Sequence, residues 1–224
     1  MNKTGKDLLK LLKEVTGAPG PQLGLKIAGF DNYFLRPIST RRDLLNPIDI
    51  TCLTNWRNRH SKAFLTEFHA TEERTAKWLY ESVHSDDSRI LFIIEDEQNQ
   101  PVGYMGIAYI DWIKSYVEAD AIVSGGDTPK GMMFSGLKTL MNWTKGQLGL
   151  ETVAVRVLSD NPALSFYRKL GFMEIRRVPL RRLDSNGLVA WIEDSSLAVA
   201  DRYLVHHLWA EDNEQKELPN TIKN

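Results

Sequence analysis

One short stretch of the chain combines a well-defined helix with a side chain that can donate a proton. Residues 161–172 read Asn-Pro-Ala-Leu-Ser-Phe-Tyr-Arg-Lys-Leu-Gly-Phe. Asn161 is a good N-cap, and Pro162 suits the first helical position, where its missing N–H costs nothing. Gly171 stands where a left-handed residue would end the helix. Tyr167 therefore lies near the middle of this helix, and a phenol with a pKa of about 10 can donate a proton once it is positioned.

Two carboxylates on an earlier segment could supply a general base. Residues 116–123 alternate in the manner of a strand, and the even spacing of Glu118 and Asp120 places both side chains on one face. A carboxylate within reach of a reacting group can accept its proton. The alternative is that both acids simply face solvent.

A glycine-bearing loop leads from this segment into a long helical pattern. It reads Ser-Gly-Gly-Asp-Thr-Pro-Lys-Gly at 124–131, and the helix is predicted over 132–148. The start of a helix offers free N–H groups and a positive dipole end to a phosphate, here from Gly131 to Ser135, with charge from Lys130. The loop matches neither a Walker motif nor a dinucleotide fingerprint, so a plain capped helix is the alternative.

The elements that must position these residues alternate along the chain. In order, the patterns predict a strand within 25–38, helices over 48–58 and 71–83, strands over 90–94, 102–109 and 116–123, the helix over 132–148, a strand over 152–157, the helix from 161, and strands over 173–180 and 203–209. Short polar turns join the three middle strands, which is typical of an antiparallel meander. The order as a whole predicts one mixed α/β domain.

The ends of the chain and one insertion fall outside this pattern. An amphipathic helix is predicted over 7–15, within an N-terminal extension and linker spanning 1–24. We expect it to pack on the domain or on a second subunit. The second case would give a homodimer. The domain is assigned to 25–212 and a polar tail to 213–224, while the polar stretch 181–199 fits no element.

The composition argues against several classes of protein. The chain has 224 residues and a net charge of -1, which argues against binding to nucleic acid or to an anionic membrane. No apolar run approaches the roughly 18–20 residues of a membrane span, and the N-terminus lacks a secretory signal. Cys52 is the only cysteine, which favours a reducing, cytoplasmic setting. The histidines match no metal-ligand spacing, so no metal is expected.

Several of these features occur in the same order in one known family. They are the Lys-Gly entry into a helix, the strand over 153–157, Asn-Pro-Ala at 161–163 and Phe-Tyr-Arg-Lys-Leu-Gly-Phe at 166–172. Together they resemble the GCN5-related N-acetyltransferase (GNAT) superfamily. The family's phosphate loop, Gln/Arg-x-x-Gly-x-Gly/Ala, is similar to residues 128–133, where Gly131 keeps the middle glycine and Thr128 and Met133 stand at the ends. Trp56-Arg57-Asn58 is more weakly similar to the branch that acetylates amino groups of nucleotide-linked sugars.

The resemblance implies a fold and an acetyl-CoA site. The fold would be a single α/β (α+β) domain with a mixed, mostly antiparallel central sheet flanked by helices. The residues implied to hold acetyl-CoA are Ala121, Ile122 and Val123 along the pantetheine, Lys130, Gly131, Met132, Met133 and Phe134 at the pyrophosphate, and Asn161, Ser165 and Phe166 on the opposite side. Tyr167 would lie beside the thioester sulfur.

The chemistry of acetyl transfer assigns expected roles to the acids and the phenol. An amine attacks as the free base, so Glu118 or Asp120, directly or through water, would take its proton. An N–H of the central strand could stabilise the oxygen that gains negative charge. Tyr167 would protonate the departing thiolate. No reactive Cys or Ser constellation occurs, so direct transfer in a ternary complex is expected.

We therefore expect an acetyl-CoA-dependent N-acetyltransferase. Its acceptor would be the primary amine of a small polar molecule, first an amino sugar, free or nucleotide-linked, with Trp56 as a stacking surface and Arg57 as an anion partner. One alternative is an acetyltransferase for protein or peptide N-termini. Another is a catalytically degenerate domain that binds acyl-CoA as a sensor or interaction module. No metal, nucleic acid or membrane partner is expected.

Overall fold

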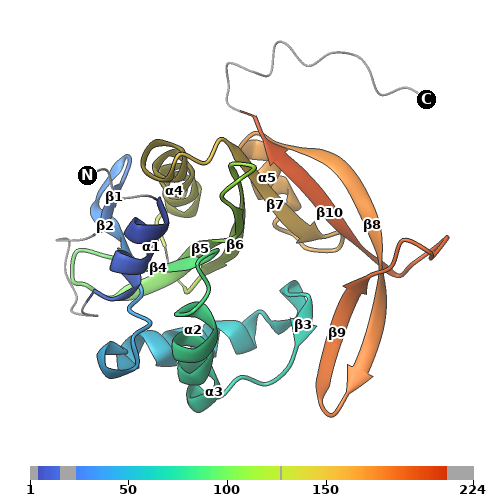
Figure 1. Cartoon of the computed structure of the whole chain (residues 1–224), viewed down its shortest axis with the longest axis horizontal. Helices are drawn as coiled ribbons and strands as arrows, with labels where there is room; N and C mark the ends of the chain where they lie inside the picture. The colour runs from blue at the N-terminus through green and yellow to red at the C-terminus, as the bar shows by residue number, and fades with distance from the viewer. Residues whose placement is uncertain (1–4, 16–23, 127, 211–224) are drawn as a thin grey trace.

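A ten-stranded sheet organises the molecule in the computed structural model, which describes residues 5–15, 24–126 and 128–210 (Figure 1). The strands are β1 (Leu25–Ile27), β2 (Phe30–Pro37), β3 (Thr66–Glu67), β4 (Ile90–Glu95), β5 (Pro101–Asp111), β6 (Tyr116–Ser124), β7 (Thr152–Leu158), β8 (Phe172–Ser185), β9 (Leu188–Glu193) and β10 (Arg202–Trp209). Their spatial order is β1-β2-β4-β5-β6-β7-β10-β8-β9-β3. All neighbours pair antiparallel except β6 and β7, which are parallel, so the predicted mixed, mostly antiparallel sheet is confirmed.

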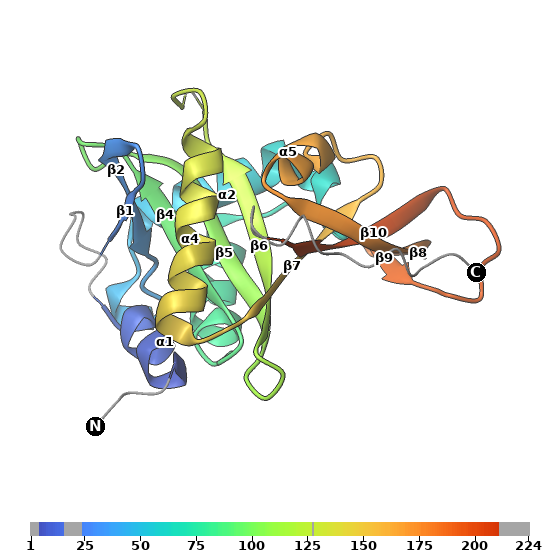
Figure 2. The ribbon, with the colours of Figure 1, turned by 90° about the horizontal axis from the view of Figure 1, so that it is seen from above.

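Helices cover both faces of the first half of the sheet. They are α1 (Gly5–Lys13), α2 (Pro47–Arg59), α3 (Glu72–Lys77) and its continuation η4 (Trp78–Val83), α4 (Met132–Leu148) and α5 (Leu164–Lys169), with short turns η2 (Arg42–Leu44) and η3 (Ser61–Ala63). Helix α4 lies along one face, and α2 and α3 lie along the other (Figure 1, Figure 2).

Strand β4 contributes side chains to the hydrophobic clusters on both faces of the sheet. Ile90, Phe92 and Ile94 belong to the cluster under α4, while Leu91 and Ile93 belong to the cluster under α2 and η4. Each of the five is at most 1% exposed. Because successive side chains point to opposite faces, a strand covered on both sides is apolar throughout.

The sequence located most helices closely. Thr71 caps α3, because its side chain accepts a backbone N–H of the first turn. The helix over 132–148 has the predicted bounds. Helix α5 instead begins at Leu164, since the side chain of Asn161 accepts the N–H two residues on, at 2.9 Å, and holds a turn ahead of the helix. Gly171, with a φ of 91°, follows the end of α5 as expected.

The stretch 181–199, which fitted no predicted element, forms most of a β-hairpin and is the main correction to the predicted fold. Strand β8 extends to Ser185, and the chain returns through Asn186 and Gly187 into β9. Both turn residues have positive φ, at 45° and 79°, as a two-residue type I′ turn requires. The Asn-Gly pair in the sequence is therefore the local signal for this hairpin.

The N-terminal helix packs directly on the domain. Leu9 of α1 is 1% exposed and belongs to the same core cluster as α4. Lys13 is buried at the end of α1, where its ammonium donates to the carbonyls of Val83 and Asp86. The Gly-Pro stretch at 17–21 and the tail at 213–224 lie outside the described residues. Among the helices that are described, none has the length and apolar character needed to cross a membrane.

Candidate active site

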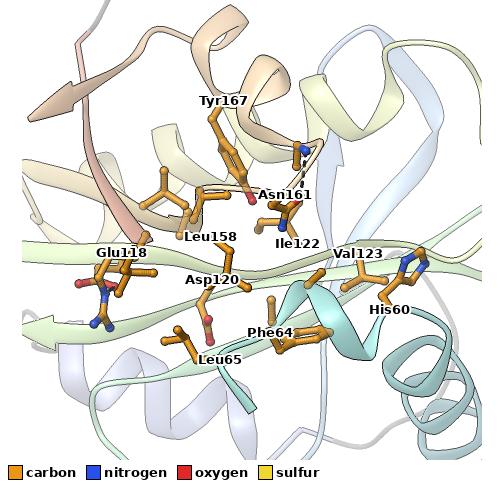
Figure 3. A pocket seen from close by; sticks show the side chains of 18 of the residues that line it. His60, Phe64, Leu65, Glu118, Asp120, Ile122, Val123, Leu158, Asn161 and Tyr167 are labelled. Atoms are coloured by element: carbon orange, nitrogen blue, oxygen red, sulfur yellow. Dashed lines mark hydrogen bonds and ion pairs between the residues drawn. The ribbon is translucent and has the colours of Figure 1, made fainter. Parts of the chain in front are cut away.

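A cavity of about 500 Å³ lies where β6 and β7 separate (Figure 3). Its walls are formed by His60, residues 63–66, Tyr109, residues 118–124, 155–158 and 161–163, Tyr167 and Leu204. This volume is typical of sites for small molecules. The cavity therefore brings together the strand that carries both predicted acids and the helix that carries the predicted tyrosine.

The cavity exists because the parallel strands pair over only half their length. Residues 116–119 pair with 152–155, but β6 continues to Ser124 and β7 to Leu158 without pairing with each other. Within the unpaired half of β6, Ala121 has a φ of 55°, and the pairing with β5 shifts register. Since a bulge bends its strand, the two facing backbone edges diverge and can pair with a ligand.

Tyr167 reaches the cavity from α5. Its ring packs edge-on against Phe166 and Phe172, with centroids 5.2 and 5.8 Å away, and the residue is 7% exposed. The hydroxyl has no hydrogen-bond partner among the described residues and points toward β6 (Figure 3). Burial, reinforced by the charge of Asp120, raises the pKa of Tyr167 above its usual value. The phenol therefore keeps its proton at neutral pH.

Asp120 reaches the cavity from β6, and its carboxylate points toward the segment that contains Leu65 (Figure 3). Burial raises the pKa of Asp120, although Arg89 and the backbone N–H of Ala121 oppose the shift. The part of the chain that the structure describes places no basic group within ion-pair distance of it. A partly desolvated carboxylate without an ion partner is suited to accept a proton.

Glu118 lines the same cavity but its oxygens are already engaged. One oxygen accepts from the Tyr116 hydroxyl at 2.8 Å, and the other accepts from the Arg156 guanidinium at 2.6 Å. Arg156 also lies over the ring of Tyr109, at 4.3 Å from its centroid. Both predicted acids therefore share one face of β6, and only Asp120 is without an ion pair among the described residues.

The start of α4 leaves backbone donors free. Gly131 precedes the helix with a φ of 88°, which glycine adopts without strain, and no side chain caps this end. Among the described groups, the N–H groups of Met133 and Phe134 have no acceptor, whereas those of Met132 and Ser135 donate within the turn. The side chain of Met133 packs against the core. The donors predicted for an anion are therefore present despite the bulky Met133.

The remaining predicted acetyl-CoA residues divide into two groups. Residues 121–123 line the cavity from β6, and Asn161 lines it from the opposite side. Ser165 and Phe166 do not line it: Ser165 is exposed, and Phe166 supports the ring of Tyr167. Lys130 is exposed beside the start of α4.

Trp56 does not reach the cavity. Its ring is 5% exposed, stacks on Tyr104 at 6.0 Å, and lies so close to Gly125 that a Cβ there would come within 2.2 Å of it. In this position Trp56 packs against Tyr104 of β5 and against Gly125 after β6, and it offers no free face to an acceptor.

Arg57 lies behind the wall of the cavity. Its guanidinium stacks on Phe64 at 3.8 Å and on Phe68 at 4.8 Å, and it donates to the carbonyl and hydroxyl of Thr66. Its Nη1 atom is fully buried without a partner among the described residues, and burial lowers its pKa. Arg57 therefore positions Phe64 and Thr66, which line the cavity, rather than facing an anion itself.

Sequence reasoning missed one wall of the cavity. Residues 60–66 follow α2, and their sequence, His-Ser-Lys-Ala-Phe-Leu-Thr, matches no motif. Leu158 and Leu204 face them from β7 and β10. The only usable signal was the Phe-Leu pair in a polar stretch, because large apolar residues outside a periodic pattern often mark a binding surface.

The family of the chain follows from a direct match to a family model. The model of the GNAT acetyltransferase domain family matches residues 34–173, which is more than half of the chain. The chain belongs to this family and is an N-acetyltransferase.

Solved structures show the same fold at low sequence identity. A probable GNAT acetyltransferase from Chromobacterium violaceum has a TM-score of 0.62 at 16% identity, covering 89% of this chain and 97% of that one. Spermidine N-acetyltransferase from Vibrio cholerae, in complex with CoA and spermine, has a TM-score of 0.59 at 18% identity, covering 79% and 95%. A dodecameric form of the Vibrio cholerae enzyme has a TM-score of 0.58 at 17% identity, covering 86% and 99%. No curated protein matches the sequence.

Proposed function

We propose that the cavity between β6 and β7 transfers the acetyl group of acetyl-CoA to the primary amine of a small molecule, by direct attack in a ternary complex. One observation carries the proposal: Asp120, a carboxylate without an ion pair among the described residues, and Tyr167, a buried phenol, line one cavity where two parallel strands diverge.

The donor occupies the divergent strands. The open backbone edge of Ala121 to Val123 pairs with the pantetheine arm, and Asn161 contacts that arm from the other side. The pyrophosphate accepts hydrogen bonds from the free N–H groups of Met133 and Phe134, and Gly131 and Lys130 complete this end. Met132, buried in the core, fixes the first turn.

The acid and the base act from different sides of the donor. Asp120 takes the proton of the attacking amine, and its raised pKa brings it closer to the amine's own basicity. Tyr167 gives its proton to the departing thiolate. The raised pKa of the phenol keeps Tyr167 protonated until that step. Glu118 has a positioning role, because its ion pair with Arg156 fixes two residues of the cavity lining. Cys52 does not line the cavity, and burial raises the pKa of its thiol, so a covalent intermediate on it has no support.

A small amine is supported as the acceptor by both geometry and comparison. The cavity has the size of a small-molecule site. The Vibrio cholerae structure of similar fold holds the amine spermine. An amino sugar has less support, because Trp56 and Arg57 do not reach the cavity. A homodimer or a larger assembly remains compatible with the dodecameric form of that enzyme.

Release of free thiol from acetyl-CoA across a panel of amines tests this proposal. We expect release with at least one primary amine, and a fall in kcat of about 10²–10⁴-fold in Asp120→Asn. Asp31→Asn, which changes an exposed carboxylate on β2, is the matched control and should behave as wild type. Release with no amine would contradict the proposal, and a thermal shift from acetyl-CoA in that case would favour the degenerate acyl-CoA-binding module.

A further inference from the structure

The wall segment, residues 60–67, crosses the acceptor side of the cavity. Ala63, Phe64, Leu65 and Thr66 all line the cavity from this segment. In Figure 3, Phe64 and Leu65 lie below Asp120, on the side away from Tyr167. Whatever amine reaches Asp120 must therefore pass against this segment.

Backbone hydrogen bonds join the wall segment to the hairpin. Strand β3 pairs antiparallel with β9, with Thr66 opposite Ala190 and Glu67 opposite Val189. The N–H of Trp191 also donates to the carbonyl of Leu65, at 2.8 Å. The edge of β9 is thus occupied by the protein's own chain, and the two walls of the acceptor side meet (Figure 1).

Side chains reinforce this junction around Arg202. Its guanidinium donates to the carbonyl of Lys62 at 3.0 Å and pairs with Glu67 at 3.3 Å and with Asp160 at 2.8 Å. It also stacks on Trp191, at 4.7 Å from the ring, and Trp191 donates to Glu67 at 2.9 Å. The Arg202 side chain is only 13% exposed. One arginine therefore ties the wall segment to the hairpin and to the turn before α5.

Four apolar side chains form one side of the acceptor half of the cavity. Phe64, Leu65, Leu158 and Leu204 face the cavity, and Leu158 and Leu204 belong to one buried cluster. Two polar side chains beside them already have partners: Glu118 pairs with Arg156, and the Thr66 hydroxyl accepts from Arg57. A ligand that placed hydroxyl groups against the four apolar side chains would leave those hydroxyls without hydrogen bonds.

We infer that the wall segment, held in place by the hairpin, forms a roof over the acceptor side, and that the acceptor is a small primary amine on an apolar body, of the alkylamine or arylalkylamine class. The inference rests on the proposed function and names its substrate class. The amine reaches Asp120 while its carbon skeleton packs on Phe64, Leu65, Leu158 and Leu204. We do not expect a polypeptide acceptor, because β3 occupies the edge of β9, which an extended chain could otherwise join.

A matched acceptor series tests the substrate class. The panel is hexylamine, 2-phenylethylamine, glucosamine and a tetrapeptide with a free apolar N-terminal residue. We expect the two apolar amines to exceed glucosamine in kcat/KM by at least about 10-fold, and the tetrapeptide to give no detectable transfer. Calorimetry with the CoA-saturated protein should give the same order of binding.

Two variants with matched controls test the roof. Leu65→Ser should lower kcat/KM for hexylamine about 10-fold and leave glucosamine unchanged, whereas Leu183→Ser, on the exposed hairpin, should alter neither. Arg202→Met should raise KM for hexylamine and allow the tetrapeptide to be acetylated. Arg181→Met, which loses only an exposed pair with Asp194, should not. An unchanged thermal shift with acetyl-CoA confirms that each variant keeps the donor half folded.

The outcomes separate this inference from the proposed function. If glucosamine or the tetrapeptide is acetylated as well as hexylamine, the substrate class is overturned while the acetyl transfer stands. If no amine is acetylated, both are overturned.

Discussion

At the scale of single residues, burial and an open cavity together suit Tyr167 to the role of an acid. Phe166 and Phe172 enclose its ring, and its hydroxyl faces the cavity (Figure 3). The same burial that raises its pKa leaves the hydroxyl dipole unsatisfied among the described residues. A group in this state gains a hydrogen bond only when a ligand supplies one, which favours contact with a departing thiolate.

Tyr167→Phe should separate the chemistry from binding. We expect kcat to fall about 10²–10³-fold, because the thiolate would leave without a proton donor. Affinity for acetyl-CoA should change little, since the ring and its packing remain. Steady-state kinetics with calorimetry measure both quantities, and turnover equal to wild type would remove Tyr167 from the acid role.

The sequence predicted some site residues better than others. Tyr167, Asp120, Glu118 and Asn161 all line the cavity, because their positions follow from strand alternation and from one short helix with the turn before it. Trp56 does not line it, since a residue type alone does not say which helix face meets the sheet. Its burial against Gly125 depends on a contact 69 residues away in the chain, which no local pattern contains.

At the scale of elements, a buried ion cluster fixes α2 to the sheet. Arg36 of β2 donates to both oxygens of Asp49 of α2, at 3.1 and 2.7 Å, and to Glu95 of β4 at 2.7 Å. The three side chains are 2–3% exposed. Because the C-terminal end of α2 carries Arg57 and leads into the wall segment, this anchor also sets the position of the cavity wall.

Arg36→Met should destabilise the protein by about 3–5 kcal/mol, since it removes the cation that pairs with two buried carboxylates. Arg41→Met is a suitable control, because Arg41 pairs with Asp43 at the surface and such pairs contribute about 0–1 kcal/mol. Urea unfolding measures both. A loss below about 1 kcal/mol in Arg36→Met would contradict the anchoring role.

The docking of α1 predicts a dependence of stability on pH. Burial lowers the pKa of Lys13 to about 8 from its usual 10.5. Between these values the unfolded chain binds more protons than the folded one, so the free energy of unfolding should rise with pH, by up to about 1.4 kcal/mol per unit. Unfolding curves from pH 7 to 10 measure this rise. It should disappear in Lys13→Met and persist in Lys10→Met, and its persistence in Lys13→Met would assign it to another group.

Element boundaries were predictable where local chemistry decides them. The bounds of α4 and the cap of α3 follow from glycine and threonine at their ends. The hairpin of β8 and β9 was missed because the polar residues around Asn186 hide the strand alternation, although the Asn-Gly pair itself was visible. The late start of α5 reflects a side-chain turn at Asn161 that competes with the helix.

At the scale of the whole molecule, the site depends on the pairing of β3 with the last hairpin of the sheet. The strand order ends with β8-β9-β3, so a strand from the first third of the chain returns beside the last hairpin (Figure 1). This return places residues 60–67 opposite the divergent ends of β6 and β7. The class of fold could be predicted from the order of elements, whereas this closure depends on pairings across more than 120 residues and could not.

A crystal structure with acetyl-CoA bound is the most direct test of this site. We expect the thioester to lie between β6 and β7, with its sulfur within hydrogen-bonding distance of the Tyr167 hydroxyl. We also expect the pyrophosphate on the N–H groups of Met133 and Phe134, and the acetyl carbon facing Asp120. A thioester bound outside this cavity, or turned away from Tyr167 and Asp120, would contradict this expectation.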